Sequence, residues 1–331
     1  MLALSIIIPF YNTPFVMLQR CLAPFLKTSY EDVEVILVDD CSTFDYEEKI
    51  IELVKQAPTN IHLWRHSHNL GQNAARTTGI QHASGSYIAF LDSDDYLETS
   101  EFAKVMDIMR TTQAQAYAMN SLAVDQNGNS VYASPECISD HEGWLPTKEA
   151  IRECSSLWHW IIKTDIVRAH ALNTSIRIGE DLVSLIPLLA DCETIYSTGA
   201  NPYRYVHHDA STVHTASLQD RVRLMTGFES MFRNNPNLLQ KYHDEVEWQV
   251  IWHILFWEAL QILRSQQEGA KEYRLAVQHW IAQYFPNWRL NPYMSKEPQA
   301  KSIRFKLITN GHYFVLSVLL WMRYCLKHIC R

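Results

Sequence analysis

The chain has 331 residues, of which 47% are hydrophobic and 20% charged, and this globular composition excludes an intrinsically disordered protein. Its net charge is −7, and the charge is unevenly distributed because no acidic residue follows Glu297. An acidic body argues against general nucleic-acid binding, which requires a broad basic surface. The basic residues of the tail are Lys301, Arg304, Lys306, Arg323, Lys327 and Arg331.

The chain begins with the apolar stretch MLALSIIIPF. This stretch lacks the charged region and the small-residue cleavage site of a signal peptide, and it is too short to span a bilayer. We therefore interpret it as a first core strand. The seven cysteines form no C-x-x-C pair and no zinc-binding spacing, which indicates free thiols in a reducing cytoplasm.

Strand and helix patterns alternate through the first 112 residues. Apolar, β-branched runs predict strands, and apolar positions at helical spacing predict helices between them. The alternation indicates an α/β fold with a mainly parallel sheet. Right-handed crossovers place the carboxyl ends of these strands along one edge, where open α/β sheets bind ligands. The expected strands are LSIIIPF, VEVILVDD, NIHLWRH and SYIAFLD, and the expected helices cover about 14–27, 44–56, 71–83 and 99–112.

The pattern changes after residue 112. Short polar segments fill 114–135, and the aromatic segment SSLWHWIIK, a helix near 181–190 and a short strand TIYST follow. Beyond about residue 216 almost every segment has helical periodicity. We expect an α/β domain over residues 1–216 and a helical C-terminal region over 217–331, ending in a basic, apolar tail.

Each of the four expected strands ends in polar residues: PFYN, DDCS, HNLGQNAAR and DSDD. Each ending has an ordinary explanation by itself. Asn12 and Ser42 are candidate helix caps, Gly71 suits a tight turn, and the acids of DSDD favour a helix N-terminus. Four such endings on one edge are better explained by one bound ligand.

A nucleotide diphosphate fits the composition of this edge. Tyr11 offers an aromatic wall for a base, and Asp39 or Asp40 offers it a hydrogen-bond partner. Phosphate charges beside carboxylates require a cation between them. Asp92 and Asp94 supply the oxygen ligands that Mg²⁺ or Mn²⁺ prefers.

Two further features concern the same edge. Arg76 lies about one turn into the helix after NLGQ, within reach of the base or a phosphate. Neither G-x-x-x-x-G-K-[ST] nor G-x-G-x-x-G occurs, which excludes the usual ATPase and dinucleotide sites. Asp95 has two possible roles. It either bonds to the residues that bind the metal or supplies a negative charge at the start of the next helix.

The motifs SIIIPFYN, EVILVDDCS, HNLGQNAARTTGI and GSYIAFLDSDDYL, in this order, resemble those of family 2 glycosyltransferases with the GT-A fold. The resemblance covers residues 1–110 and continues more weakly to about residue 214. It implies that the DSD acids bind the ribose and the divalent metal of a nucleotide sugar, commonly a UDP-sugar, and that the acid pair after the second strand contacts the base. The motif residues assigned to the nucleotide sugar are Pro9, Tyr11, Asn12, Asp39, Asp40, Asn69, Gly71, Arg76, Asp92 and Ser93.

Two later segments resemble catalytic parts of the same family. IRIGEDLVSLIPLLA resembles the acid-pair motif, which makes Asp181 the catalytic base and Glu180 its neighbour at the acceptor site. A carboxylate that accepts the hydroxyl proton is what transfer to a sugar requires, although both acids also suit a helix N-terminus. NPYRYVHHDASTVH resembles a segment with a histidine near the metal, here His208, with His207 as the second candidate and a plain surface histidine as the alternative.

The acceptor site and the tail each have two interpretations. Trp158, His159 and Trp160 suit an acceptor pocket, because sugars stack on aromatic faces, and they suit a core equally well. YFVLSVLLWM is too short to span a bilayer. With the basic residues after it, this segment either lies in an anionic membrane interface or packs on the preceding helices.

The expected function is inverting, metal-dependent transfer of a monosaccharide from a nucleotide diphosphate sugar to a glycan or lipid-linked glycan in surface polysaccharide biosynthesis. We expect a cytoplasmic enzyme, peripheral at the inner face of the plasma membrane. A non-catalytic GT-A scaffold is one alternative. A sugar nucleotidyltransferase is another, although it would require a glycine-rich, basic loop that PFYNTPF lacks. The sugar, the acceptor, the linkage and the oligomeric state are left open by the sequence.

Overall fold

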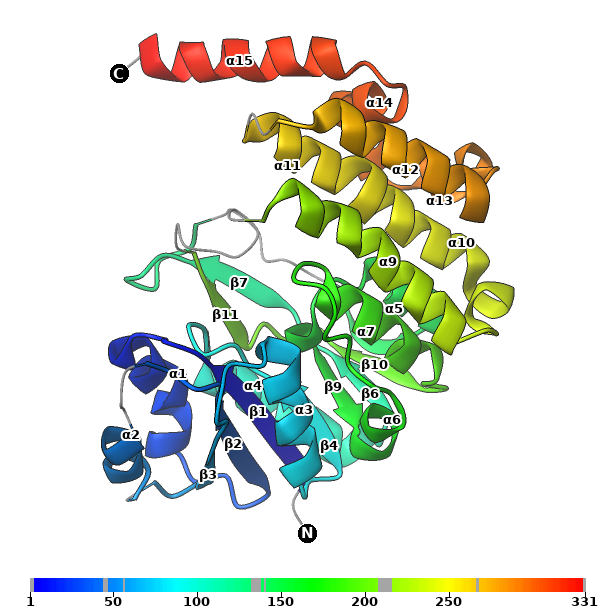
Figure 1. Ribbon diagram of the computed structural model, residues 1–331. Helices are drawn as coiled ribbons and strands as arrows, with labels where there is room; N and C mark the ends of the chain where they lie inside the picture. Colours follow the sequence, from blue (N-terminus) through cyan, green and yellow to red (C-terminus); the bar gives the residue numbers. More distant parts are fainter. Residues whose placement is uncertain are drawn as a thin grey trace. The chain divides into compact units, whose positions relative to one another are not determined.

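The computed structural model describes residues 3–43, 47–55, 57–131, 138–139, 141–207, 216–265 and 268–329 (Figure 1). The chain divides into two compact units. The first comprises Met1–Ser175 and Gly179–Ser211, and the second comprises Ile176–Ile178 and Thr212–Arg331. The inclusion of Ile176–Ile178 in the second unit was not indicated by the sequence pattern.

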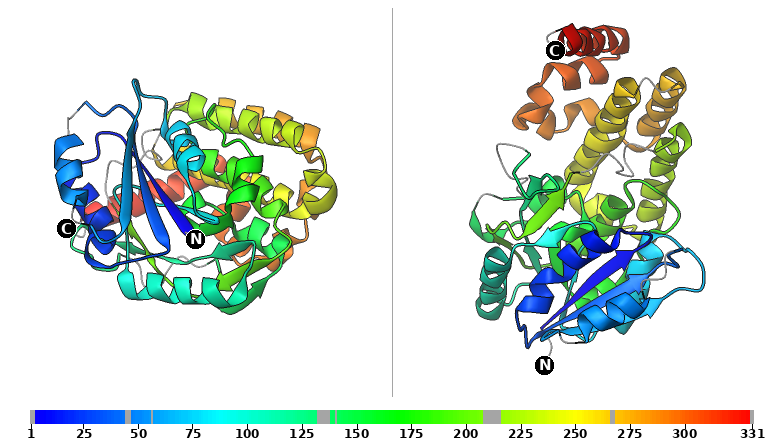
Figure 2. Two further views of the ribbon diagram at one scale, coloured as in Figure 1. Left: turned by 90° about the horizontal axis from the view of Figure 1, so that it is seen from below. Right: turned by 90° about the vertical axis from the view of Figure 1, so that its left-hand side faces the viewer.

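An eight-stranded sheet forms the centre of the first unit, in the order β3-β2-β1-β4-β9-β6-β10-β8 (Figures 1 and 2). The first four strands are mutually parallel, which confirms the α/β prediction. The strands are β1 (Leu4–Phe10), β2 (Val33–Asp39), β3 (Asn60–Arg65), β4 (Tyr87–Phe90), β6 (Ala116–Ala118), β8 (Glu142–Leu145), β9 (Trp160–Lys163) and β10 (Ile195–Thr198).

Helices cover both faces of the parallel strands, so β1 and β2 are buried along their whole length. Successive side chains of β1 point to opposite faces. Leu4, Ile6 and Ile8 join the apolar cluster with α1 and α4, whereas Ile7 faces α3. The helices of this unit are α1 (Phe15–Lys27), α2 (Glu47–Val54), α3 (Gln72–His82), α4 (Thr99–Thr112), α5 (Thr147–Glu153), α6 (Thr164–Ala169) and α7 (Glu180–Ala190).

A glycine sets the distance between α3 and β1. A Cβ added at Gly79 would lie 2.4 Å from Cγ2 of Ile7, closer than two carbon atoms can approach. The absence of a side chain at Gly79 therefore lets α3 lie against the sheet, and this helix carries Arg76 toward the ends of the strands.

The second half of the sheet is mixed, which the sequence did not predict. β9 lies between β4 and β6 and is antiparallel to both, and β10 is antiparallel to β8. A separate three-stranded sheet has the order β5-β11-β7, from Tyr96–Leu97, Tyr203–Val206 and Ser121–Val124. The aromatic segment before residue 164 thus forms a short 3₁₀ turn, Leu157–His159, followed by a central strand.

The second unit is helical, as the periodicity after residue 216 predicts. Its longest continuous run joins α10 through the π-helix η2 to α11, and Tyr242 departs from helical geometry inside α10. The helices are α9 (Leu218–Asn234), α10 (Leu238–Val250), η2 (Ile251–Glu258), α11 (Ala259–Arg264), α12 (Ala270–Tyr284), η3 (Trp288–Leu290), α13 (Tyr293–Lys296), η4 (Gln299–Lys301), α14 (Ile303–Thr309) and α15 (Tyr313–Ile329).

A buried ion pair joins two helices of this unit. Arg221 of α9 is 2% exposed and donates from Nη1 to Oε2 of Glu258, the last residue of η2, which is 6% exposed. Burial raises the pKa of Glu258, and Arg221 opposes that effect. The carboxylate therefore depends on the guanidinium for its stability in the apolar interior.

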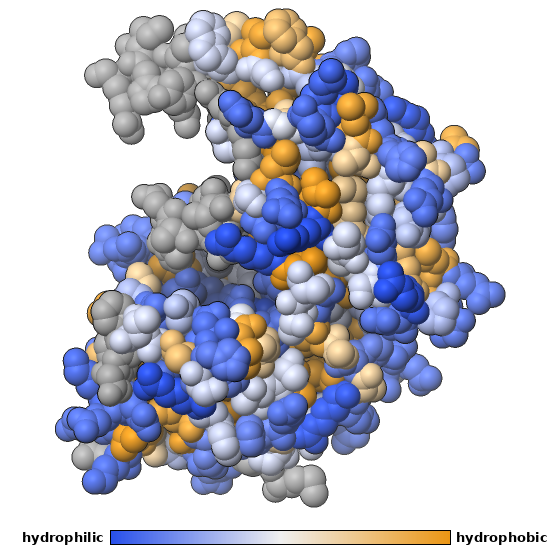
Figure 3. All heavy atoms as spheres, viewed as in Figure 1, coloured by the Kyte–Doolittle hydropathy of each residue, from blue (hydrophilic) through white to orange (hydrophobic). Residues whose placement is uncertain are grey.

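The last helix, α15, packs on α14 and α11 through one side and leaves large apolar side chains on the other. Apolar residues are visible along its course in Figure 3. Among the described residues, no helix is both long enough and apolar enough to cross a bilayer. We call the exposed side the α15 apolar face, formed by Phe314, Val315, Val318, Leu319, Trp321 and Met322.

Candidate functional site

The loops that follow β1 and β2 are tied to each other. The backbone N–H of Asn12, at φ 52°, donates to Ser42 Oγ over 2.9 Å. Oδ1 of Asn12 accepts from the backbone N–H and the hydroxyl of Thr43, at 2.8 and 2.9 Å. Asn12 does not cap α1, whose N-cap is Pro14. Tyr11 stands next to these bonds with 47% of its surface exposed, as a wall for a base requires.

Asp40 shapes the loop that precedes α3. Its Oδ1 accepts from the N–H of Leu70 (2.8 Å), its Oδ2 accepts from the N–H of Gly71 (2.7 Å), and Nδ1 of His66 lies 2.8 Å from Oδ1. Gly71 has φ 92° and ψ 160°, a region that essentially only glycine adopts. The amide of Asn69 donates to the carbonyl of Asp40 over 3.3 Å. Asp40 therefore orders this loop, and its contact with a base stays a prediction.

Asp39 ends β2 and is buried. Its Oδ1 accepts from the N–H of Ser42 (2.8 Å), and its Oδ2 lies 3.4 Å from Nε of Arg65. In the β1–β2 register Asp39 is opposite Phe10, and the buried Pro9 precedes that residue. Asp39, the last residue of β2, and Tyr11, which directly follows β1, thus lie at the ends of neighbouring strands, as a base pocket between them requires.

The DSDD segment after β4 connects to both α3 and the first loop. Oδ1 of Asp92 accepts from Nε2 of Gln72 (2.9 Å) and from Nη2 of Arg76 (3.0 Å). The hydroxyl of Ser93 lies 2.7 Å from that of Thr13. The polar ends of β1, β2 and β4 and the start of α3 therefore form one connected edge.

Asp95, left open by the sequence, is a buried structural acid. Its Oδ1 accepts from the N–H of Val206 and its Oδ2 from the hydroxyl of Tyr203, both over 2.7 Å. Burial raises the pKa of Asp95 well above its ordinary value, and the neighbouring acids add to the effect. Asp95 does not cap α4, because Glu98 accepts the first N–H groups of that helix. It instead holds the end of β4 against β11.

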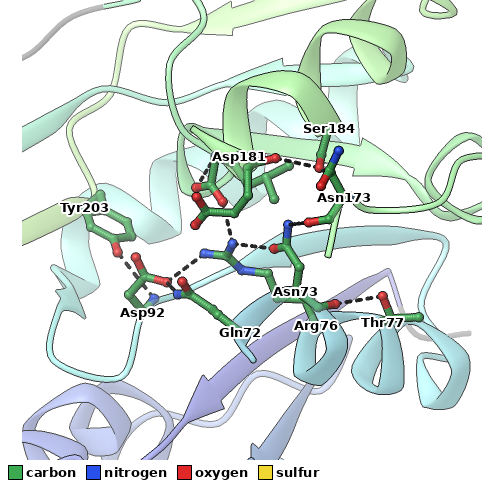
Figure 4. A network of polar contacts seen from close by, with 11 residues as sticks. Gln72, Asn73, Arg76, Thr77, Asp92, Asn173, Asp181, Ser184 and Tyr203 are labelled. Carbon is green, nitrogen blue, oxygen red and sulfur yellow. Dashed lines mark hydrogen bonds and ion pairs between the residues drawn. The ribbon is translucent and has the colours of Figure 1, made fainter. Parts of the chain in front are cut away.

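A single guanidinium joins the predicted base to the predicted metal ligand (Figure 4). Arg76 is 1% exposed and donates from Nη1 to Oδ1 of Asp181 and to Oδ1 of Asn73 (2.8 Å), and from Nη2 to Asp92. Oδ2 of Asp181 accepts from the N–H of Leu157 over 3.2 Å. The sequence predicts that Arg76 reaches a base or a phosphate, whereas the structure pairs it with two carboxylates.

Burial and neighbouring charges shift the pKa values of Asp92, Glu180 and Arg76. Burial raises the pKa of Asp92 to about 6; Asp181 and Asp94 add to this effect and Arg76 opposes it. Burial and then Asp181 raise the pKa of Glu180 to about 8. Burial by itself lowers the pKa of Arg76, but the acids Asp181, Asp92 and Glu180 outweigh it and the net pKa is raised. Among the described residues, Arg76 is therefore a buried cation surrounded by the acids Asp181, Asp92 and Glu180.

The three residues suggested for the acceptor pocket are buried. Trp158 is 7% exposed, Trp160 1% and His159 0%, and Trp158 stacks on Tyr203 with ring centroids 4.1 Å apart. Burial lowers the pKa of His159 to about 3, and its Nδ1 lies 3.1 Å from the carbonyl of Met119. These rings offer almost no surface on which a sugar could stack. The burial is what the core alternative predicts.

The predicted metal ligands are only partly described. His208 lies outside the described residues, and His207, the second candidate, follows β11 and is exposed. The oxygens of Asp92 and Asp94 are the donor type that hard divalent cations prefer. Burial is the largest cause of the raised pKa of Asp92, and a cation there would offset the repulsion that Asp181 and Asp94 add to it. These two residues therefore fit a divalent cation.

Another cluster of metal-ligand types lies in the helical unit. Within the ranges that the structure describes, ligand atoms of His243, Asp244 and Glu247 lie within 4.8 Å of one another. The amide of Asn291 donates to Oε2 of Glu247 and to the carbonyl of Asp244, each over 2.8 Å. This cluster has a structural explanation on α10 and contains no residue of the predicted site.

Several residues of the site were not predicted from the sequence. Gln72 and Asn73 were within the motif HNLGQNAAR, so their position directly after Gly71 was a usable signal. Tyr203 is within the motif NPYRYVHHDASTVH, but its bond to the N–H of Asp92, 111 positions away, had no local signal.

Comparisons with known proteins agree with this architecture. Residues 5–165 match the model of glycosyl transferase family 2. The chain is 37% identical over 214 residues to the uncharacterized glycosyltransferase EpsJ of Bacillus subtilis, covering 61% of this chain and 60% of EpsJ. It is 26% identical over 126 residues to the GalNAc(5)-diNAcBac-PP-undecaprenol beta-1,3-glucosyltransferase of Campylobacter jejuni, covering 38% of this chain and 40% of that protein. The chain thus spans only part of the length of these curated relatives.

Solved structures resemble most of the chain. The crystal structure of TarS 1-349 from S. aureus in complex with UDP-GlcNAc superimposes with a TM-score of 0.69 at 15% identity, covering 94% of this chain and 91% of that one. The resemblance extends the match in fold beyond residue 165. Residues 5–165 therefore form a glycosyl transferase family 2 domain, and the chain has the GT-A fold followed by a helical region.

Proposed function

We propose that this protein is an inverting glycosyltransferase that moves a monosaccharide from a nucleotide diphosphate sugar to a hydroxyl of a glycan or lipid-linked glycan. The observation that carries the proposal is the convergence of Asp92 and Asp181 on Arg76 beyond the carboxyl ends of the parallel strands. One acid for the phosphate side and one for the acceptor side, held in a single site, suit transfer of a sugar between two oxygens.

A UDP-sugar is the proposed donor. TarS, which shares the fold, forms a complex with UDP-GlcNAc, and this supports the choice. Tyr11 and Asp39 would receive the base at the ends of β1 and β2. The name of the Campylobacter relative gives a glycan on undecaprenol diphosphate as its acceptor, which supports a lipid-linked glycan in surface polysaccharide synthesis.

In the proposed step the acceptor hydroxyl oxygen attacks the anomeric carbon on the face opposite the diphosphate. The bond from that carbon to the phosphate oxygen breaks, and its electron pair leaves with the nucleoside diphosphate. The hydroxyl proton passes to a carboxylate oxygen of Asp181. One displacement inverts the configuration at the anomeric carbon.

The residues that would hold a divalent cation are Asp92 and Asp94, with His208 as the proposed third ligand. Bound there, Mg²⁺ or Mn²⁺ would neutralise charge on the leaving diphosphate. The chain's own contribution is to fix Asp92 through Gln72 and to keep Ser93 against the first loop through Thr13.

Binding and slow hydrolysis of donors test this function. We expect UDP and UDP-sugars with Mn²⁺ to stabilise the protein by about 2.7 kcal/mol at 100 times the dissociation constant, measured by thermal shift. EDTA should remove the shift, and UDP-sugar should be hydrolysed slowly without an acceptor. Binding without hydrolysis or transfer would favour the scaffold alternative. Release of pyrophosphate from UTP and a sugar 1-phosphate would favour the nucleotidyltransferase.

We also propose that the α15 apolar face contacts an anionic membrane from the cytoplasmic side. Its aromatic and aliphatic side chains are exposed, and α15 itself packs on the unit through its other side. The exposed Lys301 precedes α14, the exposed Lys306 lies within it, and no acidic residue follows Glu297. Apolar residues beside basic ones are complementary to an anionic interface.

Replacement of both Phe314 and Trp321 by glutamate should lower vesicle binding by about tenfold or more, because each aromatic side chain loses its favourable burial and gains a charge. Co-sedimentation with phosphatidylcholine vesicles, with and without phosphatidylglycerol, measures the effect. Leu290→Glu, at a residue 81% exposed in η3, is the matched control and should bind normally. Equal binding by all three proteins, or none by the wild type, would contradict membrane contact.

A further inference from the structure

We propose that Arg76 is a positioning residue that holds the carboxylate of Asp181 in the orientation needed for proton transfer, and that it does not bind the nucleotide. This role rests on the proposed function, in which Asp181 is the base. Arg76 would then act on the acceptor through Asp181, although it belongs to the motif HNLGQNAARTTGI, which the sequence assigns to the nucleotide-sugar donor.

The surroundings of Arg76 leave it little freedom. Its side chain is 1% exposed, lies over the ring of Phe90 (5.7 Å to the centroid) and uses both Nη atoms for the three side chains around it. A guanidinium so enclosed has no exposed surface to offer a uracil or a phosphate. To reach either, Arg76 would have to leave Asp92 and Asp181 as a pair of unscreened acids.

A second chain of hydrogen bonds connects α3, which carries Arg76, to α7, which carries Asp181. The amide of Asn73 donates to the carbonyl of Asn173 (2.7 Å), and the N–H of Asn173 donates to Oγ of Ser184 on α7 (2.9 Å). Asn73 also accepts from Arg76, so the position of the guanidinium is fixed from α3 and from the segment before α7 (Figure 4). These hydrogen bonds fix the position of α3 relative to the start of α7.

The bonding pattern at Asp181 suits a base. One oxygen accepts from Arg76 and the other from the N–H of Leu157, so two donors fix the plane of the carboxylate. An ionised carboxylate has about four acceptor sites, which leaves capacity for a hydroxyl proton. The planar fork of arginine can reach two carboxylates at once, whereas the single ammonium of lysine cannot reproduce that geometry.

Arg76→Lys and Arg76→Gln test the role through the separation of kcat from nucleotide affinity. We expect kcat to fall by about 100-fold for Gln, because a small displacement of a catalytic group has an effect of this size, and by less for Lys. The dissociation constant for UDP with Mn²⁺ should change by no more than about twofold, well under the tenfold that 1.4 kcal/mol represents. Added guanidinium should restore part of kcat in Arg76→Gly and none in Arg76→Gln, whose side chain fills the space.

Arg110→Gln is the matched control. Arg110 also contacts two carboxylates, those of Asp32 and Asp107, but its side chain is 54% exposed and its partners are outside the site. This variant should keep the wild-type kcat. Retained UDP binding by the Arg76 variants also shows that they are folded.

The outcomes separate this role from the proposed function. Weaker UDP binding with kcat preserved would overturn the positioning role and restore the nucleotide contact. Unchanged kcat and unchanged UDP binding would overturn it as well. If the wild type neither hydrolyses nor transfers any sugar nucleotide, the proposed function fails, and the positioning role fails with it.

Discussion

Asp181→Asn should lower kcat for glycosyl transfer by about 10²–10⁴-fold, the range that a general base contributes. Asparagine keeps the shape of the side chain, and its one amide oxygen can still accept from Arg76, although its NH2 group cannot accept from the N–H of Leu157 as Oδ2 of Asp181 does. It cannot accept the hydroxyl proton at the same oxygen. UDP binding, measured by calorimetry with Mn²⁺, should remain within about twofold of the wild type, well under the tenfold that 1.4 kcal/mol represents.

Two variants on the same helix sharpen the result. Asp191→Asn changes an acid at the C-terminal end of α7 whose side chain is 60% exposed and pairs with His170. It should retain full activity. Glu180→Gln tests the neighbour in the acid pair and should be less damaging than Asp181→Asn. Full turnover by Asp181→Asn, or a larger loss in Glu180→Gln, would contradict Asp181 as the base.

Arg221→Leu should lower the free energy of unfolding of the helical unit by about 3–5 kcal/mol, because it leaves the carboxylate of Glu258 buried without its guanidinium. The double variant Arg221→Leu with Glu258→Leu should recover most of the loss, since two apolar side chains leave no charge to bury. Urea denaturation followed by tryptophan fluorescence measures both. Arg223→Leu, an exposed position on the same helix, should change stability by less than about 0.5 kcal/mol.

The deficit of Arg221→Leu should also depend on pH. Burial raises the pKa of Glu258 in the folded protein, so the folded state binds the proton more tightly than the unfolded state does. The deficit should therefore be smallest below about pH 4.3, the ordinary pKa of glutamate, and should grow as the pH rises. A deficit independent of pH would show that lost packing, and not an unpaired charge, causes it.

The parallel strands were predictable because β1, β2 and β4 are continuous apolar runs, β3 alternates apolar and polar residues, and each of them ends in polar residues. These signals are local. β9 was not, since WIIK is short and becomes a strand through its pairing with β4 and β6. The polar edge was predictable in the same way, from residues that directly follow strands. The partner of Arg76 was not, because Asp181 lies 105 positions further along the chain. Local patterns therefore identified the residues of the site, whereas their pairing depended on the fold.

The π-helix η2 has a consequence for comparing this chain with its relatives. A π-helix contains more residues per turn than an α-helix, so it acts as an insertion inside a continuous helical run. A relative with one residue fewer between Ile251 and Glu258 would form a regular α-helix there, and the helix after it would keep its place. Residues before η2 would then be shifted by one position in the sequence relative to the residues after it. An alignment without a gap in this segment would therefore pair residues that are not equivalent in space.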